Sequence, residues 1–366
     1  MLFNLYMSSL PLPPEKVRLT TYADDITLVT SSPRVEHLKQ QIEPYLQTLH
    51  SWLTSRNLTL SAGKSSATIF TTWSKEVKFD PKITIAGQPI PINLKPKILG
   101  VTLDGMLSFA EHTKNTKDKV LKRNNILRKV AGQDWGCAKE TLQVTYKAIG
   151  RSVLNYGAPI WTPSLSKTNW QHLQVQQNSA LRTITGCVKM TSIEHLHNEV
   201  QMLPVREHSE MLSRQFLVGS YQKHRADHYT TKQNGPRNIK PTLKDKYYED
   251  VKDYLQDSSI SKDNYKVAIK KIHKRDVQHY TENRNRIPLA VSADELKLPR
   301  ITRIRLAQLR SGYSPMLRSY MSRINTAVED SCPDCKMPGH NVEYLFNCAK
   351  NETNLTYDDL GEDLWK

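Results

Sequence analysis

Two adjacent aspartates, Asp24 and Asp25, lie in the middle of the apolar stretch KVRLTTYADDITLVT (residues 16–30). Residues 17–22 and 26–29 are rich in β-branched and aromatic side chains, which predicts two strands joined by a tight hairpin. Side chains alternate between faces along a strand, but a tight turn breaks that alternation, so both carboxylates can lean toward one point. Because like charges held close together repel unless a cation separates them, the pair indicates a divalent metal site. The alternative is a solvated turn, since aspartate is a common turn residue.

The positive charge of the chain is unevenly distributed. The 366 residues have a net charge of +16. The net charge is +10 over residues 114–190 and +8 over residues 191–331. It is only +2 over residues 1–113 and −4 over residues 332–366. Such a concentration of one sign would repel itself without an anionic partner, and nucleic acid is the leading candidate.

The cysteines and the amino-terminal segment bear on the compartment. Of five cysteines, Cys137 and Cys187 stand apart from three that cluster within residues 332–348. An odd number of cysteines in this arrangement does not favour a framework of disulfides and is typical of a reducing compartment. We therefore expect an intracellular location, in the cytoplasm and nucleus. The opening MLFNLYMSSLPLPP has no charged leader and is not expected to be a signal peptide. No apolar run approaches membrane-spanning length, so no membrane partner is expected.

The first 113 residues mix helical and strand patterns. Apolar residues recur every three or four positions after Pro33, which predicts an amphipathic helix capped by Ser32 and kinked or divided at Pro44. Short strands are expected at residues 58–60 and 67–71 and in the segments ITIAGQPIPI and KILGVTLDG. Residues 1–113 are therefore predicted to form a small α+β unit with an antiparallel sheet.

From residue 114 onward the periodicity is helical. Residues 114–222 predict a series of helices whose basic side chains lie largely off the apolar side, with Gly186 as a helix stop. Residues 223–295 are polar, highly charged and poor in long apolar periodicity, which indicates a connector with marginal helices. In residues 296–331 apolar side chains again recur at helical spacing, among many arginines. Residues 332–348 hold the cysteine cluster, and residues 349–366 form an acidic tail. The expected fold class is α+β, mostly helical.

An ordered series of segments resembles a known family. MLFNLYMSSLP, YADD, LSAGKSSATIF and LGVTLDGMLSFAEH follow one another as in the palm region of reverse transcriptases of non-LTR retrotransposons. The match continues through VLNYGAPIW, QVQQNSALRTITG, TSIEHLHNEVQMLP and LAQLRSGYSPMLRSYMSRI. CPDCKMPGHNVEYLFNC is similar to the C-terminal cysteine motif of the insect-type, jockey-like elements. YADD alone is moderately specific, whereas the ordered series covers nearly the whole chain except the connector.

The resemblance implies a fold and a function. Residues 1–113 would be a partial palm, residues 114–222 a helical thumb, and residues 332–348 a small zinc-knuckle-like motif. The chain would be the C-terminal part of an RNA-directed DNA polymerase that performs two-metal nucleotidyl transfer at YADD. Its implied partners are an RNA template and a DNA primer, bound through the nucleic-acid backbone.

The resemblance also implies roles for individual residues. Asp24 and Asp25 would hold two Mg²⁺ (or Mn²⁺) ions, which activate the primer 3′-hydroxyl and stabilise the leaving pyrophosphate. Lys64 stands where the family has a lysine that protonates or neutralises the pyrophosphate, although a solvated turn lysine is the alternative. The residues expected to contact the nucleic acid are Tyr22, Leu99, Gly100, Lys117, Lys122, Arg123 and Lys129.

Two departures from the family pattern matter for activity and for metal binding. The family uses a third carboxylate on an upstream strand, with fingers that hold template and nucleotide, and this chain begins after the place where they would lie. We therefore expect no polymerase activity from the chain alone. The alternative function is a non-catalytic nucleic-acid-binding protein derived from such an element.

The second departure lies in the cysteine motif. The family usually has a histidine shortly before the last cysteine, where this chain has Tyr344. Tetrahedral zinc needs four ligands, and Cys332, Cys335, His340 and Cys348 could supply them if the chain between them folds back. Reduced cysteines packed in a loop are the alternative.

Overall fold

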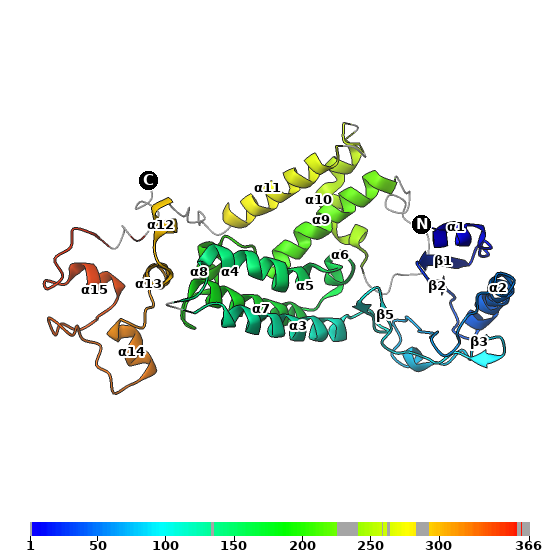
Figure 1. Cartoon of the computed structure of the whole chain (residues 1–366), viewed down its shortest axis with the longest axis horizontal. Helices are drawn as coiled ribbons and strands as arrows, with labels where there is room; N and C mark the ends of the chain where they lie inside the picture. Colours follow the sequence, from blue (N-terminus) through cyan, green and yellow to red (C-terminus); the bar gives the residue numbers. More distant parts are fainter. Residues whose placement is uncertain are drawn as a thin grey trace. The chain divides into compact units, whose positions relative to one another are not determined.

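The computed structural model divides the chain into two compact units, and the boundary between them lies after His112. Helices predominate, and strands occur only as small antiparallel pairs in the described part of the chain, so the expected mostly helical α+β class is confirmed (Figure 1). The structure describes residues 2–132, 135–224, 241–257, 259–261, 264–282, 293–356 and 360.

The first unit is built from one long helix and three hairpins. Among the described residues its strands pair only two by two, so they do not form one continuous sheet as the sequence predicted. The elements are α1 (Leu2–Tyr6), η1 (Met7–Ser9), β1 (Val17–Tyr22), β2 (Asp25–Thr30), α2 (His37–Thr54), η2 (Glu76–Lys78), β3 (Thr84–Ile85), β4 (Gln88–Pro89), β5 (Lys97–Ile98) and β6 (Val101–Thr102).

Prolines explain why the sheet is interrupted. The predicted strands at residues 58–60 and 67–71 are not formed, and Ala67 makes only an isolated parallel bridge to Ile92. Pro89 and Pro91 have no backbone N–H, so the segment opposite Ala67 cannot donate a continuous ladder of hydrogen bonds.

Helix α2 contributes one apolar face to the core of this unit. It buries Tyr45, Leu46, Leu49 and Leu53 at helical spacing, and Leu46 packs in a cluster with Ala62, Ile83, Ile85 and Ile90. The helix begins at His37, four residues later than predicted from Pro33, and it is one continuous element across Pro44 rather than two helices.

The second unit is a helical assembly whose described residues form three apolar cores, the third being that of Leu317, Val342 and Leu360. The first core gathers Leu142 and Tyr146 of α4, Leu181 and Ile184 of α7, and Leu196 of α8. Helix α7 ends, as predicted, at Gly186, which has a left-handed φ of 71°.

The elements of the second unit are α3 (Ala110–Lys129), α4 (Lys139–Tyr146), the π-helical η3 (Lys147–Arg151), α5 (Ser152–Asn155), α6 (Ala158–Trp161), η4 (Thr162–Ser164), α7 (Lys167–Thr185), α8 (Ile193–Val200), α9 (Val205–His224), α10 (Leu243–Gln256), α11 (Lys266–Glu282), α12 (Ala293–Lys297), α13 (Arg300–Arg310), α14 (Arg318–Ile324) and α15 (Val342–Asn347).

The second core lies within what the sequence indicated was a connector. Helices α10 and α11 lie along α9, and Tyr247, Val251 and Leu255 pack there with Leu217 and Ile272 (Figure 1). Apolar residues four positions apart are enough to bury one face of α10, although charged neighbours conceal that spacing in the sequence. Residues 225–240 and 283–292 of the expected connector lie outside the described residues.

A buried ion network fastens α12 and α13 to α4 and α8. Glu295 lies 2.9 Å from Arg310 and 3.8 Å from Lys139, while Glu199 lies 2.8 Å from Lys139 and 3.6 Å from Arg310. All four side chains are at most 8% exposed. Burial alone would raise the pKa of Glu295, but Arg310 and its cationic neighbours outweigh it and lower that pKa. Charges buried this deeply persist because each one faces an opposite charge.

Searched over the described residues, no helix is both long and apolar enough to cross a membrane.

Candidate functional site

The aspartate pair lies at the tip of the first hairpin. Strands β1 and β2 pair with Tyr22 opposite Asp25, which leaves Ala23 and Asp24 as a two-residue turn. Ala23 adopts a φ of 51°, as such tight hairpin turns require at their first central residue. Both aspartates are exposed, and the Tyr22 side chain beside them is 64% exposed. The predicted hairpin is confirmed, and it presents two carboxylates and a phenol ring to solvent.

The described residues supply no third ligand beside this tip. Their only cluster of three or more potential metal-ligating side chains is formed by cysteines elsewhere in the chain. Lys64, the predicted pyrophosphate contact, is exposed in the turn Ser61–Lys64, where its backbone N–H donates to the Ser61 carbonyl at 3.2 Å. Two carboxylates from one hairpin fill at most part of the octahedral shell that Mg²⁺ demands.

A second exposed hairpin carries the predicted primer contacts. Ile98 of β5 pairs with Val101 of β6, so Leu99 and Gly100 form its two-residue turn. Their φ angles are 46° and 86°, the left-handed pair of a type I′ turn. Glycine adopts this conformation freely, but a bulky leucine there is strained, and its side chain remains 49% exposed. Strain of this kind is often kept where an exposed side chain has a binding role.

Helix α3 separates a buried side from an exposed basic side. It buries Thr116, Val120, Asn124 and Leu127, which recur every three or four residues. Asn124 also ties α3 to α7, because its side-chain amide donates to the Gln176 carbonyl at 2.9 Å. Of the predicted backbone contacts, Lys122, Arg123 and Lys129 are exposed and Lys117 is half-buried. The helix therefore presents cations to solvent while its other side holds the fold.

Three cysteines meet in the C-terminal segment. The Sγ atom of Cys348 lies 3.8 Å from that of Cys332 and 3.6 Å from that of Cys335. Thiolates bound to tetrahedral zinc at about 2.3 Å lie about 3.8 Å apart, so this spacing suits the metal. The Tyr344 hydroxyl lies 2.8 Å from Cys335 Sγ, and this contact, with a backbone N–H, lowers the pKa of Cys335 to about 7. The donor set is thus three sulfurs beside a phenol.

His340 does not join the cysteines, contrary to the prediction. The cluster of potential ligands in the described chain contains Cys332, Cys335 and Cys348 alone. Gly339, with a φ of 82°, turns the chain so that His340 Nδ1 accepts a hydrogen bond from the Arg318 backbone N–H at 3.1 Å. The His340 carbonyl accepts another from Ser319, so this residue caps the start of α14. The contact of Tyr344 with Cys335 was not anticipated, although its position before the last cysteine was the available signal.

Comparisons with known proteins agree with the resemblance seen in the sequence. The chain is 29% identical over 214 residues to the Probable RNA-directed DNA polymerase from transposon BS of Drosophila melanogaster, which covers 57% of this chain and 23% of that protein. It is 28% identical over 216 residues to the Probable RNA-directed DNA polymerase from transposon X-element of the same organism, covering 56% of this chain and 23% of that one. The RNA-directed DNA polymerase from mobile element jockey of Drosophila funebris is 24% identical over 192 residues, half of this chain and 20% of that protein.

These matches establish kinship at partial coverage. The chain is related to RNA-directed DNA polymerases of non-LTR elements, and the matched region spans between a fifth and a quarter of the length of these relatives. No protein-family model matches the chain, and no solved structure matches it.

Proposed function

We propose that this chain, a relative of the polymerases of non-LTR elements, is the palm and thumb portion of an RNA-directed DNA polymerase. The observation that carries the proposal is the β1–β2 hairpin, which holds Asp24 and Asp25 together at an exposed tip with Tyr22 alongside. A carboxylate pair in that position is suited to metal ions that also contact phosphate oxygens.

In this proposal the residues of the first unit orient metal and primer. Asp24 and Asp25 hold divalent ions, which when bound would activate a primer hydroxyl and stabilise the departing pyrophosphate. Tyr22 lies beside the carboxylates, where its ring would limit the position of the primer terminus. Leu99 and Gly100 would support the primer strand from their hairpin tip. Lys64 would neutralise charge on the pyrophosphate.

The basic side of α3 would bind the template–primer backbone. Lys122, Arg123 and Lys129 are exposed and Lys117 is half-buried, so all four can reach phosphates, and none of them belongs to the core. Phosphate contacts of this kind fix the position of a duplex and contribute most of its sequence-independent affinity.

The cysteine cluster would hold one zinc ion. Cys332, Cys335 and Cys348 offer three sulfurs at a spacing that suits tetrahedral zinc, and the Tyr344 hydroxyl, 2.8 Å from Cys335 Sγ, would be the fourth ligand. Bound zinc would lock residues 332–348 into one conformation, since this small segment has little apolar core of its own.

A second candidate function is favoured by one observation. The described residues bring no third carboxylate to Asp24 and Asp25, so the chain could bind nucleic acid without catalysing transfer. The two functions differ in whether the aspartates contribute to metal binding once a duplex is present.

Manganese binding to the full chain in the presence of an RNA–DNA hybrid with a recessed DNA 3′ end separates these functions. Electron paramagnetic resonance should detect tighter Mn²⁺ binding by the unaltered chain than by Asp24→Asn/Asp25→Asn, with the exposed Glu15→Gln as a matched control that changes nothing. Equal binding by all three chains would leave only the non-catalytic function.

Primer extension provides a second measurement for the proposed function. Because ligands from one hairpin cannot complete the metal shell, the 366-residue chain should not extend a primer. A version extended at its amino-terminal end to supply a third carboxylate should do so only with both aspartates intact. Extension by the 366-residue chain that is lost in Asp24→Asn/Asp25→Asn would contradict this view.

A further inference from the structure

A cavity of about 520 Å³ opens within the second unit, and its lining includes no residue of the hairpins or of the cysteine cluster. Its walls come from η3 and α5, from the end of α8 and the segment after it, and from α9 and α11. Small-molecule sites are concave, and most measure about 300–1,000 Å³. The cavity therefore has the size of a site for a small ligand.

The charged groups that line this cavity are all cationic or histidine side chains. Lys147 and Arg151 come from η3, His208 from α9 and His273 from α11. Among the described residues that line it there is no aspartate or glutamate. Lys147 and Arg151 are four positions apart in a π-helical turn, which brings both cations to the same side. The cavity thus favours an anion.

Arg151 provides the most specific sign of a missing partner. Its side chain is only 4% exposed, and its Nη1 donates to Gln177 Oε1 at 2.6 Å and to the Leu203 carbonyl at 2.9 Å. Its Nη2 is buried and has no hydrogen-bond partner among the residues that the structure describes. An unsatisfied donor on a buried guanidinium is costly, and burial lowers the pKa of Arg151 to about 10. Because Arg151 lines the cavity, an anionic oxygen that reached this nitrogen from the cavity would satisfy it.

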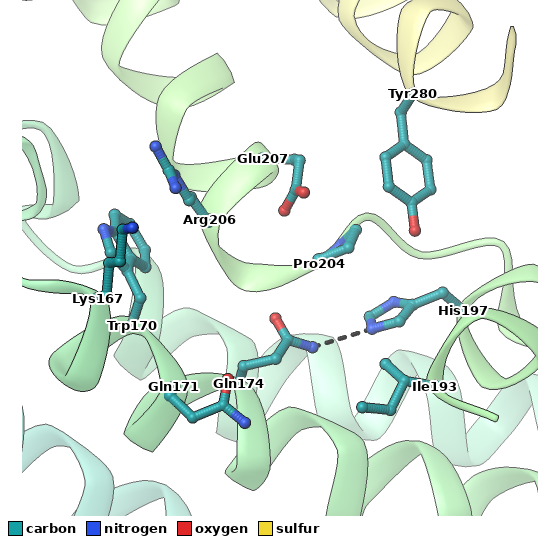
Figure 2. Close-up of a pocket in the computed structure, with 10 residues that line it drawn as sticks. All are labelled: Lys167, Trp170, Gln171, Gln174, Ile193, His197, Pro204, Arg206, Glu207 and Tyr280. Carbon is teal, nitrogen blue, oxygen red and sulfur yellow. Dashed lines mark hydrogen bonds between the residues drawn. The ribbon is translucent and has the colours of Figure 1, made fainter. Parts of the chain in front are cut away.

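An adjoining cavity shows what the cationic one lacks. The smaller cavity, of about 300 Å³, shares His197 and Tyr280 with the cationic one, but its lining includes Glu207 together with Lys167 and Arg206 (Figure 2). The smaller cavity therefore contains both signs of charge, and its Glu207 also interacts electrostatically with Arg151, whereas no carboxylate lines the larger cavity among the described residues. Lys167 of the smaller cavity offers a matched control for Lys147 of the larger one.

The shared wall is fixed in place. The Gln174 amide lies 2.9 Å from His197 Nε2, the interaction drawn in Figure 2, and His197 Nδ1 lies 2.6 Å from the Met202 carbonyl. Both ring nitrogens are thus engaged by the fold. Tyr280 reaches from α11 toward this histidine, and with Val277, Met202 and Leu203 it gives the cationic cavity an apolar side.

We propose that the cationic cavity binds the phosphate group of a nucleotide, with Arg151 Nη2 and Lys147 on the phosphate and the apolar side against the sugar and base. The nucleotide could be free or could be the phosphorylated end of a strand, since both offer the same monoester dianion. The proposal goes beyond the polymerase function and does not depend on it, because the cavity uses no residue of the β1–β2 hairpin or of α3.

The test is calorimetric titration of the full chain with adenosine monophosphate, adenosine and inorganic phosphate. The monophosphate should bind saturably, and adenosine, which lacks the dianion, much more weakly. Lys147→Gln should raise the Kd of the monophosphate about tenfold, the loss expected for one charge-assisted contact. Lys167→Gln, in the adjoining cavity, should leave the Kd unchanged. Arg151→Lys, which keeps the charge but loses Nη2, should weaken binding without unfolding the chain, as circular dichroism would verify.

Short single strands with a 5′-phosphate or a 5′-hydroxyl distinguish the two sources of the phosphate. Competition with the monophosphate by the phosphorylated strand alone assigns the cavity to strand ends, and no competition by either strand assigns it to free nucleotides. Absence of saturable monophosphate binding by the folded chain would overturn the proposal. Equal Kd values for Lys147→Gln and Lys167→Gln would do the same.

Discussion

The hairpin tips of the first unit and the buried clusters of the second unit hold their chemical groups in opposite ways. Asp24 and Asp25 are brought together by a local turn and lie in solvent, where the described chain adds no further ligand. In the second unit, Glu199 and Glu295 are almost fully buried among cations, and Cys348 converges with Cys332 and Cys335, which lie three positions apart. A local turn can bring two groups together without any tertiary contact, but a complete site requires ligands that only tertiary packing brings together.

The largest effect is expected at the cysteine cluster. The purified chain should contain about one zinc ion, and Cys332→Ser should remove it, because structural zinc sites contribute about 10–16 kcal/mol of binding free energy. Elemental analysis measures the metal content. His340→Ala should retain the zinc, since His340 caps α14, and Tyr344→His should bind it more tightly. Loss of zinc in His340→Ala with retention in Cys332→Ser would break the assignment.

How far the sequence predicted these regions depends on the range of the interactions. The β1–β2 hairpin and the end of α7 at Gly186 were predicted correctly, because a turn or a stop residue acts within a few positions. The structure does not bring His340 to the cysteines, and residue spacing does not reveal that Gly339 turns the ring toward α14.

Groups that meet only through tertiary packing were missed. Lys147, Arg151, His208 and His273 come from three elements, and no sequence pattern connects them. The two helices within the expected connector were concealed for a related reason. The burial of Tyr247 and its neighbours depends on α9 being present to receive them.

Removing one buried charge should be strongly destabilising. Glu295→Gln leaves Arg310, Arg303 and Lys139 with one anion fewer in a buried network, which should cost about 3–5 kcal/mol of unfolding free energy. Urea denaturation followed by circular dichroism measures this. Glu249→Gln breaks the exposed pair with Lys252 and serves as the control, with an expected change below about 1 kcal/mol. Equal losses in both variants would contradict the contrast between buried and exposed charge.

The pH dependence of stability should identify His208. Burial, with Arg151, His273 and Lys147 nearby, lowers the pKa of His208 to about 3, so the folded chain keeps this ring neutral while the unfolded chain protonates it near 6.5. Stability should therefore fall as the pH drops below about 6.5, by up to about 2 kcal/mol at pH 5. In His208→Gln the unfolding free energy should change less with pH between about pH 6.5 and about pH 5. An unchanged slope would show that this ring is not kept neutral.

The smallest effect on stability is expected at the aspartate tip. Because both carboxylates are exposed, Asp24→Asn/Asp25→Asn should change the unfolding free energy by less than about 0.5 kcal/mol. The same urea titration applies. A loss above about 2 kcal/mol would mean that the tip supports the fold rather than a ligand.

The salt dependence of binding to an RNA–DNA hybrid tests the central claim, that the chain binds a template–primer duplex through α3. Replacing Lys117, Lys122, Arg123 and Lys129 by alanine should reduce the magnitude of the slope of log K against log salt by about four, one for each lost phosphate contact. Replacing four exposed lysines of the first unit, Lys16, Lys75, Lys78 and Lys82, removes the same charge and should leave the slope nearly unchanged. Equal reductions in the two variants, or an affinity that does not vary with salt, would contradict the account.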